Sequence, residues 1–568
     1  MAIFIDFTPN LSNEDIIKSK IIHLNSFDDI KIRDNDYLIS KDRSVFNDVI
    51  VTSDRVFLWK KSEKVAICPL EYGTSIECPD LTTYLLIALK QIEETTQSYL
   101  PLYLPTQEVG KDTIMVGAGI VNLVTALYLV EESHSIEIYD RAPYPEKESD
   151  WRLQGATFGG LGARIFSLNE SRQHQFKGLL TQGKKAPLTF RALVEDGGWI
   201  SQKVDCNKTE SWIDDFESLP SWLIGLYNDE IIEFNKESAK HWERLFSDYP
   251  ELTHGIDYSP RLLRIYQTQE AYQKAKQTEQ AIGAYIRDVS LAELGRLEPS
   301  LEEAIATGDA VAAIEVVGFS LNIHKLGRKL ISLLESKGVT FHWRNSIEVI
   351  VKRSGVIQGL QCSDGEVISA TNYVLSLGSN HGMLLEGTRL ENKIASVVGS
   401  WTKLANETFP LTNPIKISRH GFASTGAAEG GNIIPVIDDN NNASLCIGAG
   451  HGFIGVNADI SCQAAVKTLK RCPDHIADTL LPSKFRSQDV DSFRICTRPW
   501  TSTGLGLFDT MPTENNGVLI MTGGHNTGGF AQSPAVGDAC VKTLKGQRCR
   551  MQLSYHPNRN ITHFLENS

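Results

Sequence analysis

The alternation of apolar and polar positions divides the chain into regions with different predicted structures. Three short apolar runs between residues 48 and 68 predict strands, and a helical pattern follows at 81–95. Segment 99–105 contains two prolines, which disfavour helix in the residues before them. We therefore expect residues 1–106 to form a small α+β module that an extended linker joins to the rest of the chain.

After the linker the pattern predicts a strand, a glycine turn, a helix and a second strand in succession. The apolar run 113–116 precedes the turn 117–119, the helical pattern continues through Glu131, and a second strand-like run covers 135–139. This succession is typical of the first unit of a parallel α/β domain.

The remaining regions predict helices and strands in larger blocks. Residues 196–300 are rich in helical patterns, 323–373 contain a further helix and strands, and 394–490 are rich in strands and turns. A final strand, glycine turn and helix occupy 517–545. Because 568 residues exceed what one hydrophobic core usually organises, we expect two or three domains.

The charge balance argues against a protein that binds nucleic acid. The chain has 56 Lys and Arg residues against 69 Asp and Glu residues, a net charge of −13. Affinity for a phosphate backbone depends on clustered cations, and the basic doublets at 60–61 and 184–185 are typical of solvated surface. No nucleic-acid partner is expected.

Neither a targeting segment nor a transmembrane segment is expected. The first ten residues carry Asp6 and no basic stretch ahead of an apolar core. The longest apolar stretch, 114–129, is interrupted by glycines and by Asn122 and is too short to cross a bilayer. The ten cysteines form no CxxC pair and no cluster with histidine at metal-binding spacing. We therefore expect reduced thiols, no metal site and a soluble cytoplasmic protein.

The turn at 117–119 has the features of a dinucleotide-binding site. Gly117 permits the tight turn, Gly119 lets the backbone approach a pyrophosphate, and the following helix would direct free N–H groups at the phosphates. Asp140 ends the second strand about 20 residues farther on, where a carboxylate meets the ribose hydroxyls. Asn122 replaces the third glycine of the motif, so we expect the helix to cross the strand less closely. The alternative is a glycine-rich turn that binds no ligand.

A second glycine-rich turn, 448–452, also follows an apolar strand. No second strand ending in an acidic residue follows it at the required spacing. We interpret this turn as a strand end in a substrate-binding region and expect no nicotinamide site. Electrons would then enter from the organic substrate.

Four segments together resemble a known family of flavoenzymes. They are VGAGIVNLVTALYLVEE with IEIYDRAPYP behind it, the region 349–378 that ends in YVLSLG, the run CTRPWT at 496–501, and GVLIMTGGHNTGGF at 517–530. In order and spacing they are similar to the D-amino-acid oxidase, glycine oxidase and sarcosine oxidase family over residues 110–545. The first 106 residues have no counterpart in the simpler members of that family.

This resemblance implies an α/β fold. A Rossmann-like FAD-binding domain of the glutathione-reductase type, discontinuous in sequence, would stand beside an α+β substrate domain and the small N-terminal module. The expected limits are 108–165, 318–392 and 492–548 for the FAD-binding domain, 166–317 and 393–491 for the substrate domain, and 549–568 for a C-terminal tail.

The resemblance also assigns residues to the FAD site. Ser533 and Pro534 resemble the N-cap and first-turn proline of a helix whose start would face the flavin pyrimidine. The positive end of that helix would stabilise an anionic reduced flavin by about 0.3–2 kcal/mol. The expected FAD-binding residues are Gly117, Gly119, Asn122, Asp140, Arg141, Gly159, Gly160, Arg164, Val349, Gly378, Gly523, Gly524, Asn526, Thr527, Gly528, Gly529 and Phe530.

On the substrate side, the resemblance assigns Arg498 to the substrate carboxylate. A planar guanidinium suits this task because it forms two parallel charge-assisted hydrogen bonds. The alternative is a structural arginine paired within the fold. His525 is the second catalytic candidate, or a residue that holds its loop. Thr527 stands where glycine oxidase has a further arginine, so carboxylate recognition would be weaker or supplied elsewhere.

Three other residues leave alternatives open. Cys496 aligns with the cysteine that carries covalent flavin in monomeric sarcosine oxidase, or it is a small buried residue. His420 and His451 could line the substrate side, or each could be a structural histidine.

The function that the resemblance implies is an FAD-dependent oxidoreductase. It would take a hydride from the carbon next to an amine of an amino acid or related small molecule, and the imine would then hydrolyse. The alternatives are oxidation of a secondary or N-methyl amine, oxidation of a substrate tethered to a peptide or carrier protein that residues 1–106 recognise, and a flavin-binding protein without turnover.

Overall fold

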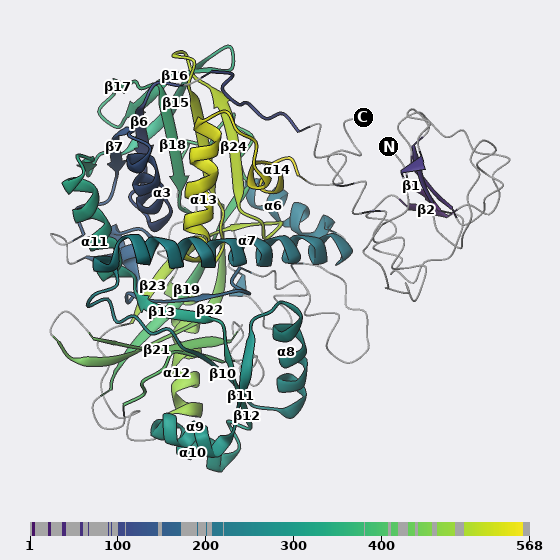
Figure 1. Ribbon diagram of the computed structural model, residues 1–568, viewed down its shortest axis with the longest axis vertical. Coiled ribbons are helices and arrows are strands. Elements are labelled where there is room, and N and C mark those ends of the chain that lie inside the picture. The colour runs from purple at the N-terminus through teal and green to yellow at the C-terminus, as the bar shows by residue number, and fades with distance from the viewer. Residues whose placement is uncertain are drawn as a thin grey trace.

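The computed structural model of the protein describes most of the chain beyond residue 100 (Figure 1). The described residues are 100–107, 109–145, 150–171, 207–219, 221–379, 381–406, 410–417, 430–437, 441–456, 463–482 and 493–559, together with Leu89, Glu93, Phe190, Ile200–Ser201 and five short strands before residue 68. Among these residues, no helix is long and apolar enough to cross a membrane.

A six-stranded sheet forms the first half of the core, in the order β14-β7-β6-β18-β25-β24. Neighbouring strands are parallel, except that β24 runs antiparallel to β25. The strands are β6 (Asp112–Val116), β7 (Ser135–Asp140), β14 (Thr340–Trp343), β18 (Asn372–Leu377), β24 (Leu507–Pro512) and β25 (Val518–Gly523).

Alternate residues of these strands pack into two different hydrophobic cores. Met115 and Ile520 pack with the helices α3 (Ile120–Glu131), α11 (Ile323–Ser336) and α13 (Gly529–Leu544). Their neighbours Ile114 and Leu519 pack instead with a small antiparallel sheet of β15 (Ile347–Arg353), β16 (Val356–Cys362) and β17 (Val367–Ile368). Because side chains of a strand point alternately to its two faces, the continuous apolar runs in the sequence bury both faces of the sheet.

A nine-stranded sheet forms the second half, in the order β11-β12-β10-β20-β21-β22-β19-β23, with β9 paired to β22. One hydrophobic core lies between this sheet and α12 (Gln463–Leu480). The strands are β9 (Ile200–Ser201), β10 (Leu262–Tyr266), β11 (Tyr285–Val289), β12 (Ala312–Val316), β19 (Ile394–Ala405), β20 (Ile415–Ile417), β21 (Gly431–Ile437), β22 (Ala443–Val456) and β23 (Arg494–Thr501).

Two elements connect the halves. The first is the two-stranded sheet of β8 (Ala163–Ser167) and β13 (Gly318–Asn322), in which β8 follows the short helix α4 (Ala156–Gly159). The long helix α7 (Ser221–Asp248) crosses the molecule at the level between the two large sheets (Figure 1). On α7, the indole Nε1 of Trp242 donates a hydrogen bond of 3.3 Å to the carbonyl of Ala531 on α13.

The N-terminal strands form a separate five-stranded sheet in the order β2-β1-β3-β4-β5. Two of them, β4 (Phe57–Lys60) and β5 (Ala66–Ile67), confirm predicted strands, whereas the sequence did not predict β1 (Ile3–Ile5), β2 (Ile21–His23) and β3 (Tyr37–Ser40). The predicted strand at 48–51 lies outside the described residues.

Residues before and after the two large sheets in the sequence pack against the core. Arg559 is 1% exposed in its side chain and pairs with Glu93 and Glu230. The amide of Tyr103 donates to the Thr510 hydroxyl at 3.0 Å, and Tyr555, next to the short helix α14 (Arg550–Ser554), is buried. Residues 550–559 therefore belong to the core, although the expected domain limits placed them in a tail.

The expected Rossmann-like fold beside a second, mixed sheet is confirmed. One local prediction was wrong: the last helix begins at Gly529, and Ser533 and Pro534 lie inside it. The domain limits stay a prediction; β23, which they place with the FAD-binding domain, pairs with β19 in the nine-stranded sheet.

Candidate active site

The glycine turn lies where β6, α3 and β18 meet. Gly117 has φ +96°, and a Cβ there would lie 2.8 Å from the carbonyl oxygen of Ser376, so only glycine fits. Gly119 is the N-cap of α3 and makes no side-chain capping bond. The next amide, of Ile120, donates 2.9 Å to the hydroxyl of Thr157. The positive end of the α3 dipole thus lies next to a glycine without a side chain and to the hydroxyl of Thr157.

Asn122 stands where the motif has its third glycine, and its side chain forms two hydrogen bonds to the backbone. Its Nδ2 donates to the carbonyls of Val116 at 2.7 Å and Gly117 at 2.8 Å, which joins the first turn of α3 to the end of β6. The side chain is fully buried. Its Oδ1 has no hydrogen-bond partner among the described residues, so one buried acceptor remains at this turn.

Asp140 ends β7 next to the same turn. Its two carboxylate oxygens accept from the amides of Ala118 at 2.5 Å and Ala142 at 2.6 Å, and burial raises its pKa above the usual range. A carboxylate can accept further bonds, so Asp140 can still receive a ribose hydroxyl. Arg141, the next residue, is exposed.

The second FAD-related segment approaches the turn from two sides. The amide of Asn345 donates 3.0 Å to the carbonyl of Asp140, and β15 begins two residues later. Val349 on β15 is 39% exposed and follows a register irregularity. Gly378 comes directly after β18, is exposed, and has open space where a Cβ would stand.

The loop around Gly159 and Gly160 lies next to the paired planar side chains of Arg164 and Trp401. Arg164 on β8 donates to the carbonyls of Ala163 and Ala156, both at 2.8 Å, and its guanidinium lies 5.4 Å from the ring centroid of Trp401 on β19. A Cβ at Gly160 would be in contact with both. The Nε1 of Trp401 is buried without a hydrogen-bond partner among the described residues.

The turn between β25 and α13 gathers the expected residues from Gly523 to Phe530. Asn526 has φ +53°, accepts from the Thr501 amide at 3.0 Å and donates 2.5 Å to the Gly504 carbonyl. Both polar groups of its side chain therefore form hydrogen bonds that stabilise the turn. Gly528, the N-cap of α13, lies so close to Ser171 that any side chain would overlap it.

Thr527 connects this turn to the β8 side of the site. Its Oγ1 accepts from the Ser171 amide at 3.2 Å, and Glu170 is a further hydrogen-bond partner. Glu170 in turn pairs with Lys416 at 2.7 Å. Thr527 is thus held in this network.

His525 lies on the inner side of the turn. It is 3% exposed, its Nε2 is 3.1 Å from the Thr522 hydroxyl, and its ring centroid is 6.2 Å from that of Tyr555. Burial lowers its pKa to about 4, so the ring is neutral at pH 7. These contacts favour the role of holding the loop over that of a catalytic residue.

Arg498 lies on β23, and its guanidinium lies next to Gly399 of the neighbouring strand β19. Its Nη1 donates 3.1 Å to the Gly450 carbonyl, and no carboxylate pairs with it among the described residues. Burial lowers its pKa, because its positive charge has little compensation. The predicted turn at 448–452 lies instead inside strand β22, which contributes the Gly450 carbonyl to Arg498.

The remaining candidates differ in their surroundings. Cys496 is 5% exposed and packs in a hydrophobic cluster with Trp401. His451 is buried beside Trp500, with ring centroids 5.4 Å apart and nearly perpendicular. His420 lies outside the described residues.

Sequence reasoning missed Thr157 and Trp401. Thr157 lies two residues before the predicted Gly159, so the local sequence offered a signal for it. Trp401 belongs to a strand far from every quoted segment and reaches the site only through the pairing of β19 with β22 and β23.

A family model described as DAO, FAD dependent oxidoreductase, matches residues 112–543. The chain belongs to this family. Members of the DAO family use FAD, which confirms the expected cofactor and an FAD-dependent oxidoreductase as the class of enzyme.

Solved structures show the same fold at low sequence identity. Glycine oxidase from Bacillus cereus is 16% identical with a TM-score of 0.54, covering 78% of this chain and 98% of its own. Fructosamine oxidase from Aspergillus fumigatus is 13% identical, with a TM-score of 0.52 and coverage of 80% and 90%. L-proline dehydrogenase from P. horikoshii is 11% identical, with a TM-score of 0.52 and coverage of 80% and 98%.

Proposed function

We propose that this DAO-family enzyme oxidises the C–N bond of a small amine that carries a carboxylate. The observation that carries the proposal is Arg498, a partly buried arginine whose one hydrogen-bond partner among the described residues is a backbone carbonyl. A cation placed this way binds an anion strongly, since charge-assisted hydrogen bonds outside water are about twice as strong as neutral ones.

The described residues fit FAD. The start of α3 at Gly119 and the Thr157 hydroxyl would hold the pyrophosphate, Asp140 would hold the ribose, and the start of α13 at Gly529 would face the pyrimidine. When bound, FAD supplies the acceptor for a hydride.

The chain's own contribution is to orient the amine and exclude water. Arg498 would hold the carboxylate and so fix the α-carbon relative to the α13 turn. The buried residues Cys496 and Trp401 share this side of β19 and β23 and keep it apolar. An apolar surrounding disfavours the charged ammonium, so the reacting amine is held neutral. The imine product then hydrolyses in water.

A secondary amine with a carboxylate is the second candidate. Iminodiacetate oxidase from Chelativorans, whose substrate by name is a secondary amine with carboxylates, has the same fold at a TM-score of 0.51 and 15% identity. No described residue supports recognition of a peptide or carrier protein by residues 1–106.

Replacement of Arg498 tests the proposal. Arg498→Met should lower kcat/KM for the carboxylate-bearing substrate about 10- to 100-fold, since a charge-assisted hydrogen bond contributes about 1.5–3 kcal/mol. Activity on the same amine without its carboxylate should not fall. Arg152→Met, at an exposed ion pair, is the matched control. Equal kcat/KM in Arg498→Met and Arg152→Met would remove Arg498 from substrate binding.

A further inference from the structure

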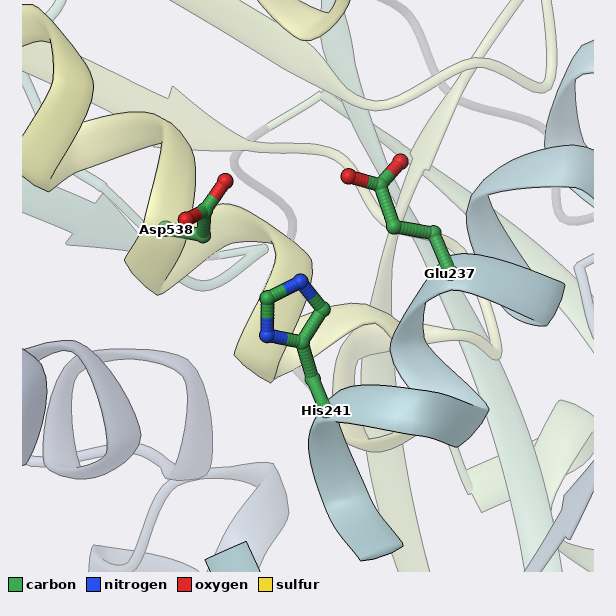
Figure 2. A group of neighbouring side chains, drawn as sticks. All are labelled: Glu237, His241 and Asp538. Atoms are coloured by element: carbon green, nitrogen blue, oxygen red, sulfur yellow. The ribbon is translucent and has the colours of Figure 1, made fainter. Parts of the chain in front are cut away.

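Three partly exposed side chains of types that can bind a metal converge between α7 and α13, away from the proposed flavin site. They are Glu237 and His241 on α7 and Asp538 on α13, and their ligand atoms lie within 4.8 Å of one another (Figure 2). Glu237 and His241 are four residues apart, so they share one face of the helix. Asp538 comes from α13, which contacts α7 through the Trp242–Ala531 hydrogen bond among others.

The imidazole of His241 is set up to act as a ligand. Its Nδ1 lies 3.1 Å from the hydroxyl of Tyr128 on α3. If Nδ1 carries the proton and donates it to the Tyr128 oxygen, Nε2 keeps a free lone pair. Metal-bound histidines commonly have such an outer partner, which fixes the tautomer and the ring orientation.

The charges around the group favour a cation. Asp538 forms an ion pair of 2.6 Å with Lys542, but a carboxylate has a second oxygen that remains available. Glu237 makes no hydrogen bond or ion pair with any other residue that the structure describes. Figure 2 shows the imidazole below and between the two carboxylates, with no carboxylate bonded to the ring. Two carboxylates thus lie on either side of the imidazole.

We propose that Glu237, His241 and Asp538 bind one Zn²⁺ ion that bridges α7 and α13, with water completing the coordination. Zn²⁺ takes imidazole nitrogen and carboxylate oxygen together, at about 2.0–2.2 Å. Ligand atoms around a tetrahedral ion at those distances are about 3.4 Å apart. The three ligand atoms would therefore have to move roughly an ångström closer to one another when the ion binds. Asp538 lies 297 positions beyond His241, so the three residues form no local sequence motif, which explains why the cysteine and histidine spacing predicted no metal site. This site is independent of the proposed oxidation.

Calorimetric titration of the FAD-loaded protein with ZnCl₂, after chelator treatment and exchange into metal-free buffer, tests the proposal. The wild-type protein should bind one Zn²⁺ per chain, and His241→Gln, Glu237→Gln and Asp538→Asn should each bind it at least 10-fold more weakly. Tyr128→Phe should weaken binding about 10-fold, because outer partners of a ligating histidine contribute 10- to 100-fold. Zn²⁺ should also raise the thermal midpoint of the wild type but not of His241→Gln.

Glu233→Gln is the matched control, because Glu233 lies one turn earlier on α7 and pairs with Lys236 outside the group. It should bind Zn²⁺ like the wild type, and all variants should keep their flavin. Two results would overturn the proposal: no saturable binding below about 1 mM ZnCl₂, or equal affinity in the three ligand variants and Glu233→Gln.

Discussion

Gly399 provides the space that the guanidinium of Arg498 occupies. The two residues lie on the paired strands β19 and β23, and any side chain at 399 would overlap the guanidinium. The position of the proposed carboxylate ligand therefore depends on the absence of a side chain on the neighbouring strand.

Gly399→Ala should displace Arg498 and lower kcat/KM for a carboxylate-bearing amine at least 10-fold, through a higher KM. FAD binding should be unchanged, because the proposed cofactor residues are elsewhere. Steady-state kinetics and the flavin-to-protein absorbance ratio measure both effects. Gly295→Ala on α9 (Leu291–Leu297), where a Cβ meets only ordinary contacts, is the control. An unchanged KM in Gly399→Ala would contradict this role for Arg498.

Asn122 should stabilise the dinucleotide turn through its two donated hydrogen bonds. Asn122→Asp replaces the donating amide with a carboxylate facing two carbonyls, and Asn122→Gly restores the usual motif residue. We expect Asn122→Asp to weaken FAD binding more than Asn122→Gly, with a loss of about 1–3 kcal/mol for buried carbonyls left unpaired. Fluorescence titration of the flavin-free protein with FAD measures the order, and equal affinities would show that the bonds contribute nothing.

The buried ion pair between Arg559 and Glu93 should be important for stability. The guanidinium donates to both carboxylate oxygens of Glu93, at 2.5 and 2.9 Å, across 466 positions of sequence. Arg559→Ala would remove the guanidinium that pairs with the buried carboxylate of Glu93, at a cost of about 3–5 kcal/mol. The thermal midpoint should fall clearly in Arg559→Ala and stay unchanged in Arg152→Ala, whose arginine is 67% exposed. Equal midpoints would contradict the structural role.

The buried His525 predicts a stability loss in acid. Its pKa is about 4 in the folded protein and about 6.5 when unfolded. Between these values the unfolded chain binds a proton that the folded chain does not, so stability falls as the pH drops from 6.5 to 4, by about 1–3 kcal/mol. Thermal midpoints from pH 4.5 to 7.5 should fall less steeply in His525→Gln. Parallel pH dependences of the two proteins would contradict the lowered pKa.

The sequence was sufficient for the fold because its signals were local. The apolar runs, the glycine turn and Asp140 lie within about 30 residues, which is the size of one βαβ unit. The start of α13 was misjudged because Ser533 and Pro534 normally mark a helix start. Here Pro534 cannot donate to the Phe530 carbonyl, and the Ser533 hydroxyl donates to it instead, at 2.9 Å, so the helix continues.

The site was less predictable because several of its contacts are not local. The motif identified Arg498, but its surroundings come from Gly399 and Gly450 on two other strands. Trp401 reaches Arg164 across 237 positions, and no spacing rule connects them. The occupied side chains of Asn526 and His525 likewise became visible only once Thr501, Gly504 and Tyr555 were placed around them.

Anaerobic flavin reduction tests the central claim most directly. The visible spectrum of the purified protein is recorded while glycine, N-methylglycine, iminodiacetate, and D- and L-amino acids are added. Each is compared with the matched amine that lacks the carboxylate. We predict flavin bands that bleach with at least one carboxylate-bearing amine and far more slowly with its matched amine, and that this difference is lost in Arg498→Met. Flavin that bleaches equally with both members of every pair, or with none of these amines, would contradict the account.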